Sequence, residues 1–114
     1  MNLNPGSPRH LWVVASAPNA EGEIAIFNLT TERDDSDKSC VVMPGEHPFV
    51  KQRSVVAYAR GRLLGPAALQ GMQRLGCYAS KEITSPRLLQ KIQEGALRSP
   101  FTAGKLKVLI QVSI

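Results

Sequence analysis

The pattern of apolar and polar positions in the first part of the chain predicts a β-hairpin. Residues 11–16 (LWVVAS) and 23–29 (EIAIFNL) are short runs rich in branched and aromatic side chains. The segment between them carries the turn formers Pro18, Asn19 and Gly22. Two strands joined by such a segment pair as an antiparallel hairpin.

Two further strands are predicted downstream of a polar loop at residues 31–39. The third covers residues 40–43 and ends at Pro44 and Gly45, a pair that suits the central positions of a type II turn. The fourth covers residues 50–59, where polar and apolar side chains alternate with the period of two that a half-buried strand requires.

The period then changes from that of a strand to that of a helix. Residues 68–75 predict a short helix that stops at Gly76, and residues 85–97 predict a longer one. Ser85 is suited to cap the longer helix, and Pro86 is suited to its first turn.

The longer helix is amphipathic, and its two faces have different expected roles. One arc, expected to pack on the sheet, holds Leu88, Leu89, Ile92 and Ala96. The opposite arc holds Arg87, Lys91, Glu94 and Arg98, and is interpreted as a solvated face rather than a binding stripe. The apolar run at residues 105–114 predicts a last strand between other strands. Together these elements predict an α+β fold, with a compact, curved, mostly antiparallel sheet and a C-terminal amphipathic helix packed on it.

Length and composition favour one domain, since 114 residues bury a single modest core. The chain is 43% hydrophobic and 20% charged, and no apolar run approaches the roughly 20 residues of a membrane span. The first ten residues do not form a secretory signal, so we expect a cytoplasmic location and no membrane. Cys40 and Cys77 match no metal or redox spacing and are expected to pack as small apolar side chains.

The charges are distributed unevenly along the chain. The net charge is +5, but residues 1–50 carry seven acids and three bases, whereas residues 51–114 carry two acids and eleven bases. A field of this kind attracts polyanions, so it favours a nucleic acid or an acidic protein as partner. A solvated basic surface that only keeps the protein soluble is the alternative.

The sequence lacks the motifs of several common enzyme classes. A nucleophile elbow, a P-loop and a dinucleotide-binding glycine pattern are all absent, so a serine triad, phosphoryl transfer from ATP and hydride transfer are not favoured. We expect neither a cofactor nor a metal site. The two histidines, His10 and His47, are suited to exchange protons near neutral pH, since the unperturbed imidazole pKa is about 6.5.

Cleavage of RNA without a metal needs a base for the 2′-hydroxyl, an acid for the leaving 5′-oxygen and donors for the phosphate charge. The residues that can supply these groups are His10, Thr30, Thr31, His47, Lys51, Ser54, Tyr58, Arg60 and Arg62. Each also has an ordinary structural interpretation. His47 can cap the turn that precedes it, and Ser54 and Tyr58 can form cross-strand pairs.

Four segments in order resemble landmarks of the MazF/PemK family, the toxins of toxin–antitoxin pairs. They are RHLWVVASAPN (residues 9–19), IAIFNLTT (24–31), SVVAYARGRLL (54–64) and LLQKIQEGAL (88–97). The resemblance spans most of the chain. It implies an SH3-like barrel, a homodimer, metal-independent cleavage of single-stranded RNA, and neutralisation by an acidic antitoxin-like protein.

Carried onto this sequence, the family's strand-end threonine falls on Thr30, with Thr31 beside it. The arginine that opens the first landmark falls on Arg9 or His10, and counting back from Ser16 selects His10. The later arginine falls on Arg60 or Arg62. Some members carry an acid just after this later arginine, whereas here Gly61, Leu63 and Leu64 occupy that stretch.

These considerations give one hypothesis about catalysis and one alternative. The hypothesis places an imidazole pair in the roles of base and acid, with the catalytic set His47, His10, Thr30 and Arg60. The expected substrate-binding residues are Arg9, Thr31, Lys51, Ser54, Tyr58 and Arg62. The alternative is a non-catalytic basic module on the same fold that holds RNA or an acidic protein.

Overall fold

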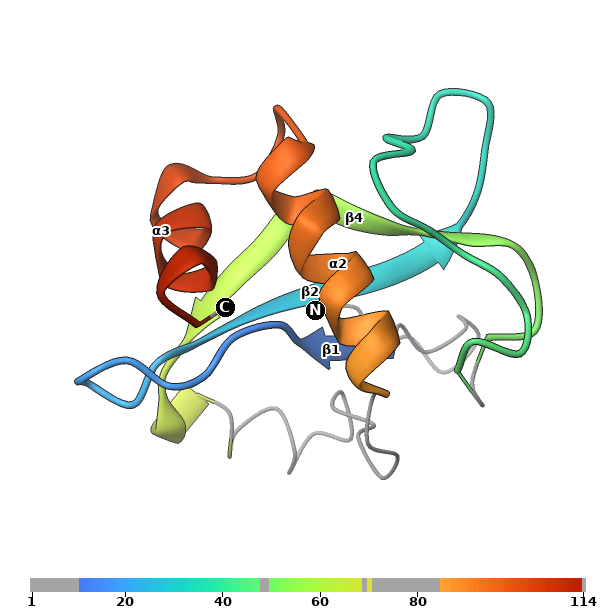
Figure 1. Ribbon diagram of the computed structural model, residues 1–114. Coiled ribbons are helices and arrows are strands. Elements are labelled where there is room, and N and C mark those ends of the chain that lie inside the picture. Colours follow the sequence, from blue (N-terminus) through green and yellow to red (C-terminus); the bar gives the residue numbers. More distant parts are fainter. Residues whose placement is uncertain (1–10, 48–49, 69, 71–84, 114) are drawn as a thin grey trace.

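The computed structural model describes residues 11–47, 50–68, 70 and 85–113. Over these residues the named elements follow one another as β1 (Leu11–Val14), β2 (Ile24–Thr31), β3 (Val41–Val42), β4 (Ser54–Leu64), α2 (Pro86–Arg98) and α3 (Gly104–Ser113) (Figure 1). The strands come first and these two helices last.

The strands form one antiparallel sheet in the order β1-β2-β4-β3. The long strands β2 and β4 lie at its centre. A bulge interrupts their pairing. Ile26 pairs with Arg62 and Asn28 pairs with Ala57, so two residues along β2 correspond to five residues along β4. The surplus residues lie on β4, and a bulge of this kind bends and twists the strand that carries it.

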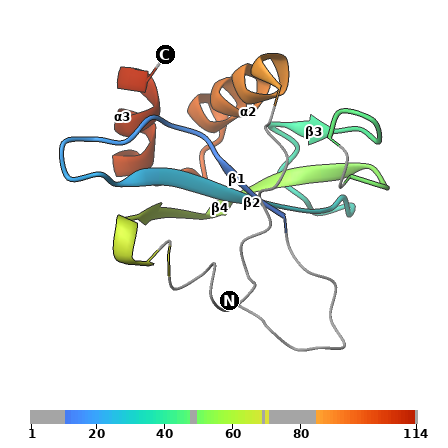
Figure 2. The same ribbon diagram turned by 90° about the horizontal axis from the view of Figure 1, so that it is seen from below.

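Helices α2 and α3 cover the same face of the sheet (Figure 2). The main core lies between them and the strands, with Phe27 from β2, Tyr58 from β4, Ile92 from α2 and Ile110 from α3 all buried. The Phe27 and Tyr58 rings meet edge to face, with centroids 5.1 Å apart. Burial of large apolar side chains between two layers is the principal stabilising contribution here.

A smaller apolar cluster forms among the strands themselves. It consists of Trp12, Ile24, Ile26 and Leu64, with Val14 packed against it. These residues alternate along β1 and β2 with those of the main core, as the period of two in a strand requires.

Helix α2 forms where the sequence predicts it. The Ser85 hydroxyl accepts a hydrogen bond from the Leu88 amide at 3.2 Å, and Pro86 begins the helix. Leu88, Ile92 and Ala96 of the predicted apolar arc are buried in the main core. The predicted capping is confirmed, and so is the predicted core face except at Leu89, which is only partly buried.

The predicted strand at residues 105–114 is wrong, because residues 104–113 form helix α3. Leu106, Leu109 and Ile110 are its buried residues, and their spacing of three and four is that of one helical face. Val108 and Val112 are 61% and 76% exposed. A short apolar run can form either a strand or a helix. The two exposed valines raise the apolar content of residues 105–114 to that of a buried strand, although they do not face the core.

The α+β class and the antiparallel sheet with a C-terminal helix are confirmed, as is the hairpin of β1 and β2. All four strands differ from their predicted bounds. β1 ends two residues early and β2 continues to Thr31. β3 has only two residues, and β4 begins at Ser54 and extends to Leu64. The predicted helix at residues 68–75 lies mostly outside the described residues. Within the described part of the chain, no helix combines the length and the apolar character that crossing a bilayer requires.

Candidate functional site

A tight turn follows β3 and directs the next residues toward α2. The Glu46 amide donates a hydrogen bond to the Met43 carbonyl oxygen at 3.1 Å, and Gly45 has φ +95°. These are the features of the type II turn that Pro44 and Gly45 predict. The turn fixes the position from which Glu46 and the residue after it project.

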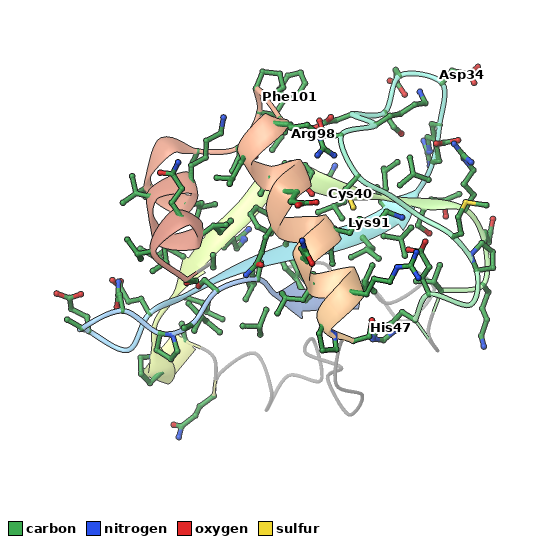
Figure 3. The ribbon with its side chains drawn as sticks, in the orientation of Figure 1. Asp34, Cys40, His47, Lys91, Arg98 and Phe101 are labelled. Atoms are coloured by element: carbon green, nitrogen blue, oxygen red, sulfur yellow. The ribbon has the colours of Figure 1, made fainter. Side chains whose placement is uncertain are left out.

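His47 comes directly after this turn, and its side chain is buried, with 4% of the residue exposed. Its carbonyl oxygen accepts a hydrogen bond from the Val50 amide at 3.0 Å. Figure 3 labels His47 on the loop beside the first turn of α2. The imidazole is therefore packed into the protein at this loop and is not displayed on an open surface.

The loop and the start of α2 border a pocket of about 600 Å³ that is open to solvent. This volume is within the range of small-ligand sites. We call it the loop–helix pocket. It is lined by Gly45, Glu46, Ser85, Arg87, Leu88 and Lys91.

The loop–helix pocket carries an excess of positive charge. Arg87 and Lys91 supply two cations and Glu46 one anion. The Lys91 ammonium donates to both Glu46 carboxylate oxygens, at 2.9 and 3.0 Å. The positive end of the helix dipole adds to the field of the two cations. The first turn of α2 contains no acidic residue that would neutralise it.

Several residues predicted for the site meet elsewhere, where β2 ends and β4 begins. Thr31 lies opposite Ser54, and Thr30 lies opposite Val55. The Ser54 hydroxyl donates to the Gln52 carbonyl oxygen at 2.9 Å. The sheet register therefore brings Thr30, Thr31 and Ser54 to the same end of the sheet, and exposed Lys51 lies in the segment that leads into β4.

The two predicted arginines lie toward the other end of β4. Arg62 faces Ile26, which is five residues before Thr31 in β2. At about 3.4 Å per residue, the two ends of this stretch are about 17 Å apart. Arg60 lies in the bulge, between Ala57 and Arg62 of β4. Arg60 and Arg62 are both exposed. The structure does not bring Arg62 to the threonines.

Tyr58, predicted to bind substrate, is a core residue that is 1% exposed. Its hydroxyl donates a hydrogen bond to the Ile92 carbonyl oxygen at 2.7 Å and so connects β4 to α2. Burial, followed by the neighbouring Cys40, raises the pKa of this phenol well above its ordinary value. The phenol therefore stays protonated. The hydrogen bond to α2 gives the Tyr58 hydroxyl a structural role in the core.

Cys40 is also buried in the main core, and burial raises the pKa of its thiol. It packs as the small apolar side chain that the sequence predicts. Cys77, Arg9 and His10 lie outside the described residues, so the expected pair of His10 with His47 is not described.

The acidic loop after β2 is more than the solvated turn that its composition suggests. Asp37 accepts hydrogen bonds from the Ser39 hydroxyl at 2.6 Å and from the Ser99 hydroxyl at 2.5 Å. The Arg98 guanidinium donates to the Ser39 carbonyl oxygen at 2.6 Å. These contacts hold the loop against the end of α2. Among the described residues, no group of three or more histidine, cysteine or acidic side chains is placed to hold a metal ion.

Sequence reasoning missed Glu46, Arg87 and Lys91 as residues of one site. In the sequence alone, Arg87 and Lys91 belong to a helix face interpreted as solvated, and no role is predicted for Glu46. The spacing of Arg87 and Lys91 places them on one side of α2, which is a signal in the sequence. The contact of Lys91 with Glu46 joins segments 45 residues apart, and no local pattern reveals it.

Comparison with protein-family models, with curated proteins and with solved structures found no match to this chain.

Proposed function

We propose that this chain binds single-stranded RNA and that the loop–helix pocket receives a phosphate of its backbone. The observation that supports this most directly is the meeting of two cations and a helix N-terminus in one pocket of about 600 Å³. A guanidinium presents paired donors to phosphate oxygens, and an ammonium acts as a point charge. Arg87 and Lys91 supply one of each.

The balance of charge along the described chain supports the same proposal. Among the described residues from Val50 onward, nine side chains are basic and only Glu94 is acidic. A polyanion gains from each such cation through release of its counterions, whereas a neutral metabolite does not. The acidic side chains of the described residues are concentrated before Val50, so the two signs of charge belong to different segments.

The proposal is tested by replacing the pocket cations one at a time. Arg87→Gln and Lys91→Gln should each weaken binding of a fluorescent single-stranded RNA and lower the slope of log affinity against log salt by about 0.7. Lys105→Gln is the matched control, since it removes one exposed cation from α3, outside the pocket. Equal losses in all three variants would show diffuse attraction and would contradict a pocket.

Cleavage of the bound RNA is a second candidate function, favoured by the place of His47 directly after a pocket residue. A base would take the proton of the 2′-hydroxyl, the 2′-oxygen would attack phosphorus, and the 5′-oxygen would leave with a proton from an acid. An imidazole can make one of these proton transfers, and the buried side chain of His47 would have to reach the phosphate to do so. The resemblance to MazF/PemK toxins supports this candidate, and with it an SH3-like barrel, a homodimer, an acidic antitoxin-like partner and a cytoplasmic location.

This second candidate is tested by incubating the purified chain with a defined RNA in EDTA and mapping the new ends. Ends with 2′,3′-cyclic phosphate, made by the parent chain and lost in His47→Ala, would support a metal-independent endoribonuclease. His47 is buried, so thermal unfolding of the variant must be measured alongside. Intact RNA that is nevertheless bound would leave the protein as a binding module.

A further inference from the structure

The loop–helix pocket contains its own anion. Glu46 and Lys91 both line it, and the Glu46 carboxylate contacts the Lys91 ammonium through both oxygens, at 2.9 and 3.0 Å. The two side chains are 34% and 39% exposed, so the pair lies at the pocket surface where a ligand can reach it. Without a ligand, one of the two pocket cations is therefore already paired.

We infer that Glu46 is a built-in competitor of the phosphate, so that ligand must displace this carboxylate from Lys91 in order to bind. This inference rests on the proposed function. The backbone at Glu46 is fixed by the turn at Gly45, so the side chain alone has to move. The Glu46 side chain is partly exposed, and an ion pair at the surface contributes little free energy, so a phosphate can replace the carboxylate on Lys91 at little cost.

The competition also selects the class of ligand. A simple monocarboxylate would replace one carboxylate on Lys91 with another and gain nothing there. A strand of RNA offers several phosphates, so one can take Lys91 while the same strand reaches Arg87 and the other cations. Glu46 therefore lowers the affinity for every anion, and a polyanion has the additional contacts that compensate for this loss.

A tether is the alternative role for the same ion pair, and it predicts the opposite sign. If Glu46 only held the loop against α2, its loss would loosen the pocket and weaken binding. If Glu46 competes, its loss frees Lys91 and removes a charge that repels phosphate, so binding strengthens. The direction of the change in affinity separates the two roles.

The experiment compares Glu46→Gln with the parent chain, using fluorescence anisotropy of a labelled single-stranded RNA at one fixed salt concentration. We expect the dissociation constant to fall about two- to fivefold, the range that an exposed ion pair is worth. Glu21→Gln, in the exposed turn between β1 and β2, makes the same change of charge far from the pocket residues in sequence and is the control. In a Lys91→Gln background the gain from Glu46→Gln should shrink, since no ammonium remains to be freed.

Each outcome bears on the inference in a defined way. Tighter binding by Glu46→Gln alone, with the gain diminished in the Lys91→Gln background, supports it. Weaker or unchanged binding by Glu46→Gln, or an equal gain in Glu21→Gln, overturns it while the proposed RNA binding stands. If neither the parent nor Glu46→Gln binds RNA, both proposals fail together. Thermal unfolding of each variant confirms that the compared chains are folded.

Discussion

Replacing Gly95 by alanine tests how closely α2 packs on the sheet. In an exposed helix this change is stabilising by about 1 kcal/mol, because alanine has the higher helix propensity. Here Gly95 is buried, and an added Cβ would lie 2.8 Å from Cys40 Cβ and 3.1 Å from the Ser39 carbonyl oxygen, and would overlap the Tyr58 hydroxyl. Backbone and buried atoms cannot yield as a flexible surface side chain does.

Overpacking of a core by one methyl group costs about 1–3 kcal/mol. Subtracting the helix propensity gained, about 1 kcal/mol, leaves a net loss of about 0–2 kcal/mol in the free energy of unfolding. Because the added Cβ overlaps the Tyr58 hydroxyl, we expect the upper half of this range, about 1–2 kcal/mol. The steric term and not the propensity term determines the expected sign.

The assay is urea denaturation followed by far-UV circular dichroism and by fluorescence of Trp12, the only tryptophan. Gly104→Ala in α3 is the matched control, since nothing lies within 4 Å of its added Cβ, and it should leave stability unchanged or slightly raised. If Gly95→Ala proves as stable as the parent chain, the close packing of α2 against Tyr58 and Cys40 is wrong.

Two further predictions concern the hydrogen bonds that anchor the same helix. Tyr58→Phe removes the bond to the Ile92 carbonyl oxygen, and should cost about 0.5–1.5 kcal/mol of unfolding free energy in the same urea assay, with no loss of RNA binding. For Asp37, burial raises the pKa, but hydrogen bonds from Ser39 and Ser99 outweigh it and leave the pKa below 3.8. The contribution of Asp37 to stability is therefore full above that pH and is lost as pH falls through the lower folded-state value. The difference in stability between the parent and Asp37→Asn should shrink on acidification, and a constant difference would contradict this assignment.

What the sequence predicted correctly depends on local contacts. The hairpin of β1 and β2 is encoded by turn formers between two apolar runs, and α2 by a capping serine followed by proline and an amphipathic repeat. Helix α3 was mistaken for a strand because its branched residues have strand propensity while its buried residues follow a helical spacing. The spacing determined the outcome, since Leu106, Leu109 and Ile110 face the core together.

The candidate site was only partly predictable for a related reason. Thr31 and Ser54 meet because β2 pairs with β4, a pairing that the sequence did not predict. Three facts needed the structure: the burial of His47, the 2.9 Å contact between Glu46 and Lys91, and the bulge in β4. Each depends on how distant segments pack, and a pattern in one segment carries no information about that.

The bulge has a consequence for the chemistry of the protein. Gly61 lies within it and allows α3 to approach β4, since a Cβ on Gly61 would lie 2.8 Å from Leu106 Cδ1 and would overlap the Phe27 ring. The same bulge carries Arg60, while Arg62 beyond it is about 17 Å from Thr31 along the sheet. Neither Arg60 nor Arg62 is among the residues that line the loop–helix pocket.

If the chain cleaves RNA, the cation that acts on the phosphate should therefore come from the loop–helix pocket. Arg87 lines this pocket with Glu46, the residue before His47, whereas Arg60 does not line it. Arg87→Gln should then slow cleavage by more than Arg60→Gln does, by about tenfold for each 1.4 kcal/mol of transition-state stabilisation removed. The measurement is single-turnover cleavage of one RNA at saturating protein, so that weaker binding does not contribute. A larger defect in Arg60→Gln would place the reacting phosphate at the β4 bulge instead.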